Sequence, residues 1–188
     1  MNPVNGDDRL LVPHSERDHF QGSLEAPVVL VNYGDYQCFI CGEVHRLIKA
    51  IQQPFAIGVA ASEKTQLCLV FRHCPQTQLH PHAQKAAETA ETAAAQGQFW
   101  QMHDVLFEHQ QALQNGDLVK YANELGLDIP RFLRDIANRT YLNRVNEDIE
   151  SGQRSGVASP PALFINGIRY RDAWDAESLQ GAIVRLIK

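Results

Sequence analysis

Two cysteines separated by two residues, Cys38 and Cys41, stand between a predicted strand and a predicted helix. The apolar, β-branched run over 27–33 predicts a buried strand that ends at Gly34. Apolar residues then recur at helical intervals over 44–51, which places the cysteines in the first turns of a helix. Residues three apart on a helix have Cα atoms roughly 5 Å apart, within the ~4.4–6.8 Å of a disulfide. The chain therefore has to present a thiol pair that can close and open without moving the backbone.

The two thiols are expected to differ in reactivity. Unpaired amides and the macrodipole at a helix N-terminus favour a thiolate, which is the nucleophile in thiol–disulfide exchange. Cys38 is nearer to that terminus, so we predict that it is the attacking thiol and that Cys41 is the buried resolving thiol. A helix terminus contributes roughly 0.3–2 kcal/mol, and one pKa unit corresponds to about 1.36 kcal/mol. This effect alone can lower a thiol pKa from about 8.5 to about 7, but not to the ~3.5 of the strongest periplasmic oxidant.

Length and charge favour a single domain that does not bind nucleic acid. The chain has 188 residues, of which 44% are hydrophobic, and a net charge of −5. The segment Met1–Gln21 is polar and lacks the positively charged start and apolar core of a signal peptide. No apolar run approaches the ~20 residues of a membrane span. We therefore expect a cytoplasmic protein without nucleic-acid or membrane partners, although removal of a leader would leave the same sequence.

The other two cysteines, Cys68 and Cys74, are predicted to be buried structural thiols. They bracket a run that reads as a strand, and six residues of extended chain separate their Cα atoms by roughly 20 Å. They cannot bridge each other while that strand is intact. Free cysteine often packs as a small apolar group.

Helical periodicity dominates the middle of the chain. The patterns predict helices over 81–96, 99–111, 118–125 and from Pro130 to Gly152, with an N-cap for the third within 115–117. Glycines at 97 and 126 are expected to separate neighbouring helices. Apolar residues that should face the core in the region after Pro130 include Phe132, Leu133 and Ile136.

A hairpin and a last helix are predicted at the C-terminal end. The strand 162–165, the turn Asn166-Gly167 and the returning strand 168–171 form a strong hairpin signal. Asp175 is expected to cap a helix in which Leu179, Ile183 and Leu186 lie on one side.

Three separated motifs resemble one family, the DsbA-like branch of the thioredoxin superfamily. They are Gly34-Asp35-Tyr36-Gln37-Cys38-Phe39-Ile40-Cys41; the middle group Phe71-Arg72-His73-Cys74-Pro75, His80-Pro81-His82-Ala83 and Gln96-Gly97-Gln98-Phe99-Trp100; and Gly156-Val157-Ala158-Ser159-Pro160-Pro161-Ala162-Leu163-Phe164-Ile165-Asn166-Gly167. The resemblance implies an α/β, thioredoxin-like fold with a helical insertion over about 75–154, in one domain over 21–188 after an N-terminal extension over 1–20. It also implies that Pro161 is a cis-proline whose loop, with Pro160, binds the substrate peptide beside the cysteines.

The dipeptide between the cysteines departs from the better-known members of the family. Phe39 and Ile40 replace the Pro-His or Gly-Pro found there, and neither side chain can donate a hydrogen bond or a positive charge to the thiol. Nearby acidic groups, Asp35 and Glu43, should oppose ionisation of Cys38, while His45 and Arg46 are expected to compensate in part. We expect a less oxidising couple than that of the strong periplasmic oxidant, whose potential is about −120 mV.

The expected activity is thiol–disulfide exchange with protein or low-molecular-weight thiols, without a cofactor, in concert with a redox partner that no residue identifies. Two alternatives stay open. Cys38, Cys41 and His45 could bind zinc, with His73, His80 or His82 as a fourth ligand. The dithiol could also regulate a peptide-binding or chaperone-like module that does not turn over substrate efficiently.

A prediction follows from the residue before the expected cis-proline. In the family that the motifs resemble, the backbone at this position pairs with the substrate chain in a strand-like way, but Pro160 has no N–H to donate. We therefore expect weaker or altered peptide binding than in a general protein oxidant. We expect Pro160→Thr to restore that donor and to raise the rate of exchange with peptide disulfides. The measurement is the rate with a peptide compared with the rate with a small disulfide. Unchanged peptide rates would show that the missing donor has no role.

Overall fold

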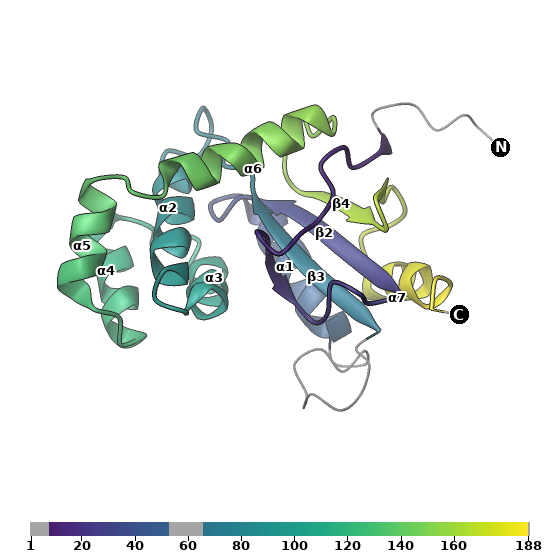
Figure 1. The fold of residues 1–188 in the computed structure, drawn as a ribbon, viewed down its shortest axis with the longest axis horizontal. Coiled ribbons are helices and arrows are strands. Elements are labelled where there is room, and N and C mark those ends of the chain that lie inside the picture. Colours follow the sequence, from purple (N-terminus) through teal and green to yellow (C-terminus); the bar gives the residue numbers. More distant parts are fainter. Residues whose placement is uncertain (1–7, 53–65, 188) are drawn as a thin grey trace.

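The computed structural model describes residues 8–52 and 66–187, and its centre is one sheet of five strands (Figure 1). The strands, in the spatial order β1-β3-β2-β4-β5, are β1 (His19–Gln21), β3 (Leu67–His73), β2 (Val28–Gly34), β4 (Ala162–Ile165) and β5 (Ile168–Arg169). β2 and β3 run parallel, and the other neighbours are antiparallel. Strands β2, β3 and β4 are buried at every position, which explains why their sequences are continuous apolar runs instead of alternating ones.

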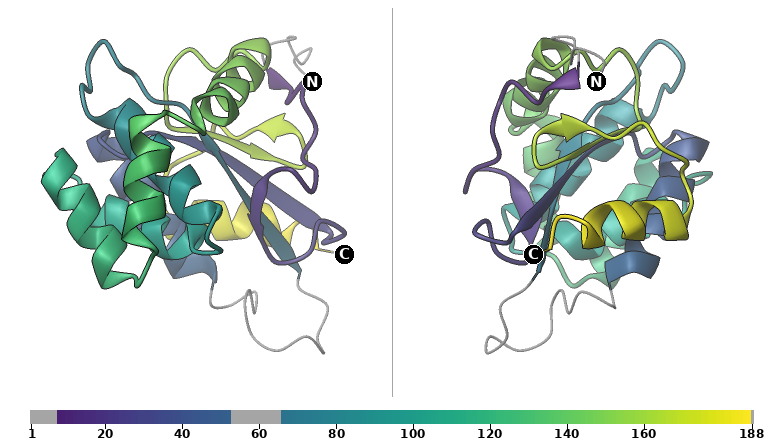
Figure 2. Two further views of the ribbon diagram at one scale, coloured as in Figure 1. Left: turned by 60° about the vertical axis from the view of Figure 1, so that its left-hand side comes forward. Right: turned by 90° about the vertical axis from the view of Figure 1, so that its right-hand side faces the viewer.

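The helices fall into two groups (Figures 1 and 2). α1 (Phe39–Gln52) and α7 (Ala176–Val184) pack on one face of the sheet, where Leu30 and Leu163 meet Ile48 and Leu179 in one apolar cluster. The others lie mainly beyond the end of the sheet: α2 (Ala83–Ala94), α3 (Phe99–Glu108), α4 (Asn115–Glu124), α5 (Ile129–Ala137) and α6 (Leu142–Arg154). The second group is the predicted insertion between the two halves of the sheet.

The hairpin of β4 and β5 forms where the sequence predicts it. Asn166 and Gly167 have φ angles of 47° and 79°, and a two-residue turn of type I′ requires positive φ at both positions. The Asn166 side chain also accepts a hydrogen bond from the Val29 N–H (2.8 Å) and donates one to the Pro27 carbonyl (3.0 Å). The hairpin is thereby attached to the beginning of β2.

Three details of the helices differ from the sequence predictions. α4 begins at Asn115 instead of Leu118, because the Asp117 carboxylate accepts the backbone N–H of Gln114 (3.0 Å) from inside the first turn. Leu133 and Leu186, both expected in the core, are 47% and 44% exposed. Leu133 follows the buried Phe132 at the edge of the apolar stripe of α5, and Leu186 lies beyond the end of α7 at Val184, so both side chains remain in solvent.

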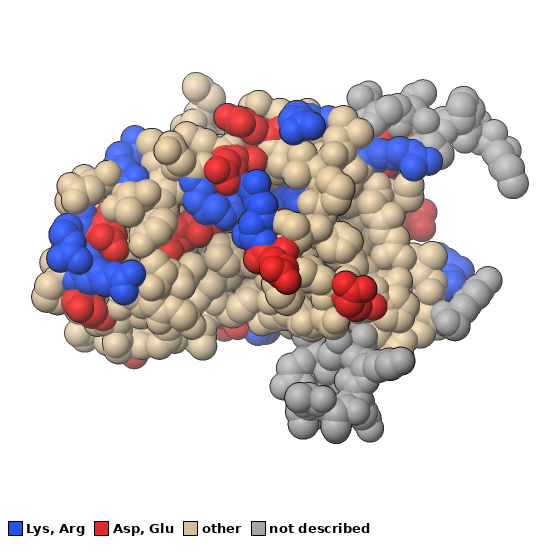
Figure 3. Space-filling model, in the orientation of Figure 1, with Lys and Arg blue, Asp and Glu red and all other residues tan. Residues whose placement is uncertain are grey.

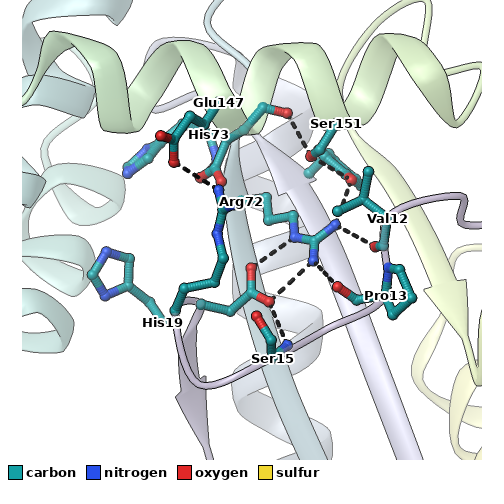
Figure 4. A network of polar contacts seen from close by, with 12 residues as sticks. Val12, Pro13, Ser15, His19, Arg72, His73, Glu147 and Ser151 are labelled. Carbon is teal, nitrogen blue, oxygen red and sulfur yellow. Dashed lines mark hydrogen bonds and ion pairs between the residues drawn. The ribbon is translucent and has the colours of Figure 1, made fainter.

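The segment before β1 is held by a buried arginine, Arg72 of β3 (Figure 4). Its guanidinium donates to both carboxylate oxygens of Asp18 (2.8 and 3.0 Å) and to the carbonyls of Val12 and Pro13 (both 2.9 Å). It also donates to the Tyr33 hydroxyl (2.9 Å). Every donor direction of the side chain is thus matched by an oxygen, which is the condition for burying this charge.

This anchor changes the boundary set by the sequence analysis, which separated residues 1–20 from the domain. β1 begins at His19 and pairs with β3, and Arg9 bridges to Ile168 on the opposite edge of the sheet. The described part of the extension therefore belongs to the fold, while residues 1–7 lie outside the described residues. The β1 pairing was missed because His19-Phe20-Gln21 is too short and too polar to stand out as a strand.

On the outer surface, basic and acidic side chains are interspersed on the face shown in Figure 3. Examples of pairs are Arg17 with Glu147 (2.7 Å) and Arg139 with Glu88 (2.6 Å). Among the described residues, no helix has both the length and the apolar character needed to cross a bilayer.

The Arg72 anchor predicts an unequal cost for removing two aspartates. Asp18→Ala leaves a buried guanidinium without its carboxylate, and we expect a loss of about 3–5 kcal/mol in the free energy of unfolding. The matched control is Asp8→Ala, which removes the more exposed pair with Arg171 and should cost less than about 1 kcal/mol. Urea denaturation of both variants measures the difference. Equal losses would contradict the assigned role of Arg72.

Candidate active site

Cys38 lies between the end of β2 and the first residue of α1. Its backbone N–H donates to the Asp35 carbonyl (3.2 Å), and its own carbonyl accepts the N–H of Gly42 (3.2 Å), the first helical hydrogen bond of this turn. The backbone N–H of Cys41 points back and donates to the Cys38 Sγ at 3.3 Å. The turn therefore directs a helix-terminal amide at one sulfur, as the N-terminus of a helix does for an anion.

The surroundings of the two sulfurs differ strongly. The pKa of Cys38 is lowered to about 6, chiefly by the hydrogen bond from the Cys41 side chain and further by the Cys41 backbone N–H, against opposing effects of burial and of Asp35. Burial is the largest cause that raises the pKa of Cys41 far above its ordinary value, and the thiolate of Cys38 adds to it. At neutral pH the pair thus consists of a thiolate at Cys38 and a thiol at Cys41.

Asp35 connects this turn to the loop that follows β3. The carboxylate is buried, and it accepts hydrogen bonds from the backbone N–H of Gln37 (2.7 Å) and of Gln76 (2.8 Å). The His80 Nδ1 lies 2.7 Å from the same carboxylate, and the electrostatic effect of this side chain lowers the pKa of Cys38, less than the hydrogen bonds from Cys41 do. Sequence analysis did not give His80 this role, although the His-Pro-His segment was part of the family resemblance.

The predicted electrostatic help from His45 and Arg46 is wrong. The His45 ring is buried and stacks on Phe107 with ring centroids 4.7 Å apart. Burial lowers its pKa to about 4, so the ring is neutral at pH 7. Arg46 forms an exposed pair with Glu43 instead of facing the thiols. His45 follows Cys41 by four residues and so lies on the buried side of α1, whereas the histidine with an electrostatic effect on Cys38 is His80, on another segment.

The proline segment reaches the same edge of the sheet. The peptide bond between Pro160 and Pro161 is cis. β4 begins with the next residue, Ala162, which pairs with Tyr33 near the end of β2. The strand pairing therefore brings Pro161 beside the point where the chain leaves the sheet for the Cys38 turn. The side chain of Gln76 donates to the carbonyl of Ala158 (3.5 Å), which connects the proline segment with the Asp35 loop.

Cys68 and Cys74 have different surroundings from the thiol pair. Cys68 is fully buried and Cys74 is partly buried, and neither forms a disulfide. Burial raises the pKa of each thiol to about 12, which keeps both protonated and unreactive near neutral pH.

The ligands of the zinc alternative do not converge in the described part of the chain. Within the described part of the chain, the groups of three side chains whose ligand atoms converge are His19 with His73 and Glu91, and His45 with His103 and Asp104. Neither group contains Cys38 or Cys41. In the first group both imidazoles lie 2.8 Å from one oxygen of Glu91, a hydrogen-bonded clamp that connects β1 and β3 with α2.

Exposed apolar side chains surround the turn. Phe39, Ile40 and Leu79 are 66%, 59% and 71% exposed, although the first two begin α1 directly beside Cys38. Next to Phe39 lies an open cleft of about 350 Å³, whose lining includes Phe107, His109 and Gln110 from the insertion. The surface around the thiol pair is thus suited to contact with apolar groups.

The dithiol lies at a strand-to-helix turn, and the proline segment lies at the same edge of the sheet. Together with the helical insertion between the two halves of the sheet, these features define a thioredoxin-type fold of the DsbA-like kind. A family model described as Thioredoxin matches residues 14–185. The chain belongs to the family described as Thioredoxin, and the predicted fold class is confirmed.

Solved structures with this fold are known from several bacteria. BdbD from Bacillus subtilis in its oxidised form has a TM-score of 0.80 at 21% identity, over 96% of this chain and 98% of that chain. The alpha-DsbA1 protein of Wolbachia pipientis has a TM-score of 0.76 at 18% identity, over 95% and 94%. A thioredoxin-like oxidoreductase from Silicibacter pomeroyi has 0.75 at 20%, over 91% and 92%. At these identities the likeness concerns the fold.

Relatives with higher sequence identity are longer proteins, and this chain matches only a part of each. The chain is 39% identical over 176 residues to "Na(+)/H(+) antiporter NhaA 3" of Salinispora tropica, which covers 93% of this chain and 26% of that protein. It is 38% identical over 178 residues to "Na(+)/H(+) antiporter NhaA 1" of Mycolicibacterium vanbaalenii, with 93% and 28% covered. The chain spans about a quarter of the length of these relatives.

The lowered pKa of Cys38 predicts its reactivity against pH. Because the thiolate is the reactive form, alkylation of Cys38 should rise with pH to a plateau, with a midpoint near pH 6. His80→Ala removes the side chain that is hydrogen-bonded to Asp35 and leaves the negative charge of Asp35 without this partner, so the midpoint should move up by about 0.5–1 unit. His82→Ala, in the same loop but without a bond to Asp35, is the control. Mass spectrometry of the alkylated peptide gives the rates, and equal midpoints in both variants would contradict the role of His80.

Proposed function

We propose that this chain is a thiol–disulfide oxidoreductase that exchanges disulfides with protein or low-molecular-weight thiols through Cys38 and Cys41. The observation that carries the proposal is the 3.3 Å hydrogen bond from the Cys41 N–H to the Cys38 sulfur, with a lowered pKa at Cys38 and a raised one at Cys41. One ionised and one protonated thiol, one helical turn apart, is the pair that exchange chemistry uses.

In the reducing direction, the Cys38 thiolate attacks one sulfur of a substrate disulfide. The S–S bond breaks, its electron pair leaves on the second substrate sulfur as a thiolate, and a mixed disulfide with Cys38 remains. Cys41 then loses its proton to solvent and attacks the Cys38 sulfur. The bond between Cys38 and the substrate breaks, and the substrate sulfur that Cys38 had attacked leaves as a thiolate. The substrate has then gained two electrons, and the Cys38–Cys41 pair has been oxidised to a disulfide. The oxidising direction reverses each step.

The surface around the thiols supports an extended, apolar peptide as the protein substrate. Phe39, Ile40 and Leu79 offer exposed apolar area around Cys38, and the neighbouring cleft offers about 350 Å³ beside Phe39. Pro161, which directly precedes β4, is assigned to the loop that contacts the peptide, and Pro160 limits the hydrogen bonds that this loop can donate.

The acidity of Cys38 supports reduction or isomerisation over strong oxidation. A pKa of about 6 lies between the ~8.5 of a free thiol and the ~3.5 of the most oxidising family member. Since stabilisation of the thiolate makes the reduced form more favourable, a smaller stabilisation corresponds to a less oxidising couple. The cytoplasmic location inferred from the sequence stays a prediction and is compatible with this direction. The exchange itself uses no cofactor.

The relatives suggest a second element of the proposal, a transporter as partner. Proteins named as sodium/proton antiporters carry a stretch 38–40% identical to this chain as part of their length. We include an antiporter among the candidate partners, beside free protein and small-molecule thiols.

Turnover tests the proposed activity against the alternative of a redox-regulated binding module. We expect the protein to catalyse reduction of insulin by dithiothreitol, because both steps of the exchange are supported by the site. Cys38→Ser should abolish the activity, Cys41→Ser should reduce it severely and accumulate mixed disulfides, and Cys68→Ala should retain it. A wild-type protein whose dithiol titrates but which gives no more than the uncatalysed rate would overturn the proposal in favour of the binding module.

The partner is identified by trapping. In cells, Cys41→Ser leaves Cys38 without its resolving thiol, so substrates remain attached by a disulfide that survives denaturing purification. Cys38→Ser with Cys41→Ser is the control that retains no bound partner by this route. Recovery of an antiporter among the trapped proteins supports the transporter as partner, and recovery of other proteins alone argues against it.

A further inference from the structure

The side-chain amide of Gln110 contacts the backbone around the nucleophile from the helical insertion. Gln110 follows α3 in the connection to α4, far in sequence from the cysteines. Its Nε2 donates to the carbonyl of Tyr36 at 2.9 Å and to the carbonyl of Cys38 at 2.7 Å. A primary amide has two N–H groups, so both are used on this one turn.

Gly42 shows how closely this amide approaches α1. A Cβ built on Gly42 would overlap the Oε1 of Gln110 and come within 2.8 Å of its Cδ. Glycine inside a helix destabilises it by about 0.5–1 kcal/mol relative to alanine. A glycine nevertheless occupies the helical position directly after Cys41. The absence of a side chain at Gly42 leaves the space that the Gln110 amide occupies.

The turn is fixed at Tyr36 from two sides. The Tyr36 ring is buried, and its hydroxyl forms a hydrogen bond with His103 Nδ1 (3.0 Å) on α3. Its carbonyl accepts from Gln110 in the segment after α3. Side chain and backbone of the same residue are thus attached to the insertion, two positions before Cys38.

We propose that Gln110 is a positioning residue for disulfide exchange, which holds the turn 36–38 so that the Cys41 N–H stays directed at the Cys38 sulfur. This inference rests on the proposed function for its biological meaning. The Cys38 carbonyl that accepts from Gln110 also accepts from the Gly42 N–H, so a shift of this carbonyl moves the first turn of α1 as well. Gln110 does not touch the reacting sulfur and acts through the backbone.

Replacement of the donor tests the proposal. Gln110→Met keeps similar volume but has no N–H, so the turn loses both bonds, and Gln111→Met changes the exposed neighbour as a control. We expect Gln110→Met to raise the midpoint of Cys38 alkylation by up to about 1 pH unit, because a less directed amide stabilises the thiolate less. The Gln111→Met midpoint should equal that of the wild type. Identical midpoints in all three proteins would overturn the proposal.

Gly42→Ala provides a second, independent test in a variant that favours the helix. The added methyl group displaces the Gln110 amide, so we expect a midpoint shift in the same direction as in Gln110→Met. In the double variant the two shifts should not add, because both remove the same contact. Additive shifts would overturn the proposal even if Gln110→Met folded poorly.

A redox equilibrium with glutathione completes the experiment. In the Gln110→Met and Gly42→Ala proteins the reduced dithiol should be easier to oxidise than in the wild type, because a less stabilised Cys38 thiolate makes the reduced form less favourable. An unchanged equilibrium constant beside an unchanged midpoint counts against the proposal. Alkylation and redox equilibrium need no catalytic turnover. A wild-type protein inactive on insulin, with Gln110 variants that shift the midpoint, would therefore refute the proposed function and leave the positioning role intact.

Discussion

Parallel pairing of β2 with β3 determines where the chemistry of this protein can lie. The pairing continues to the last residue of each strand, Gly34 and His73, and Cys74 then donates to the Gly34 carbonyl at 2.8 Å. The segments that follow the two strands therefore begin at the same edge of the sheet. The Cys38 turn and the loop that carries His80 meet there because they follow parallel strands. The Pro161 segment joins them because β4 runs antiparallel to β2 and begins beside its end.

The same turn gives two cysteines opposite properties. At Cys38 the hydrogen bond from Cys41 outweighs burial as a cause of the pKa shift, whereas at Cys41 burial is the largest cause and the neighbouring thiolate adds to it. The difference follows from the direction of the helix. Amides at an N-terminus point toward residues that precede them, so the first sulfur receives a donor and the second is placed deeper in the core. Asymmetry of the pair is thus a consequence of placing Cys-x-x-Cys at the beginning of a helix.

Sequence reasoning reached the features that depend on local pattern. The buried strands, the thiol turn and the hairpin at Asn166-Gly167 each have a signal within a few residues, and the motifs together indicated the fold. It missed what depends on a single distant contact. Arg72 stands within an apolar strand and gives no sign in sequence that it holds Asp18 and the segment before β1. The effect of His45 was misjudged because the sequence does not show that Phe107 from the insertion stacks on this ring and that burial keeps it neutral.

The insertion takes part in the site in addition to covering the sheet. Asp35 holds the Cys38 turn to the loop at the beginning of the insertion through Gln76 and His80, and Gln110 holds the same turn from the segment after α3. The first contact changes the charge near the sulfur, while the second determines how the backbone is directed. Both contacts act on the acidity of Cys38, the first through charge near the sulfur and the second through the direction of the Cys41 amide, so each can vary separately among proteins that share this fold. Sequence changes in the insertion are therefore able to adjust the redox chemistry without altering either cysteine or the residues between them.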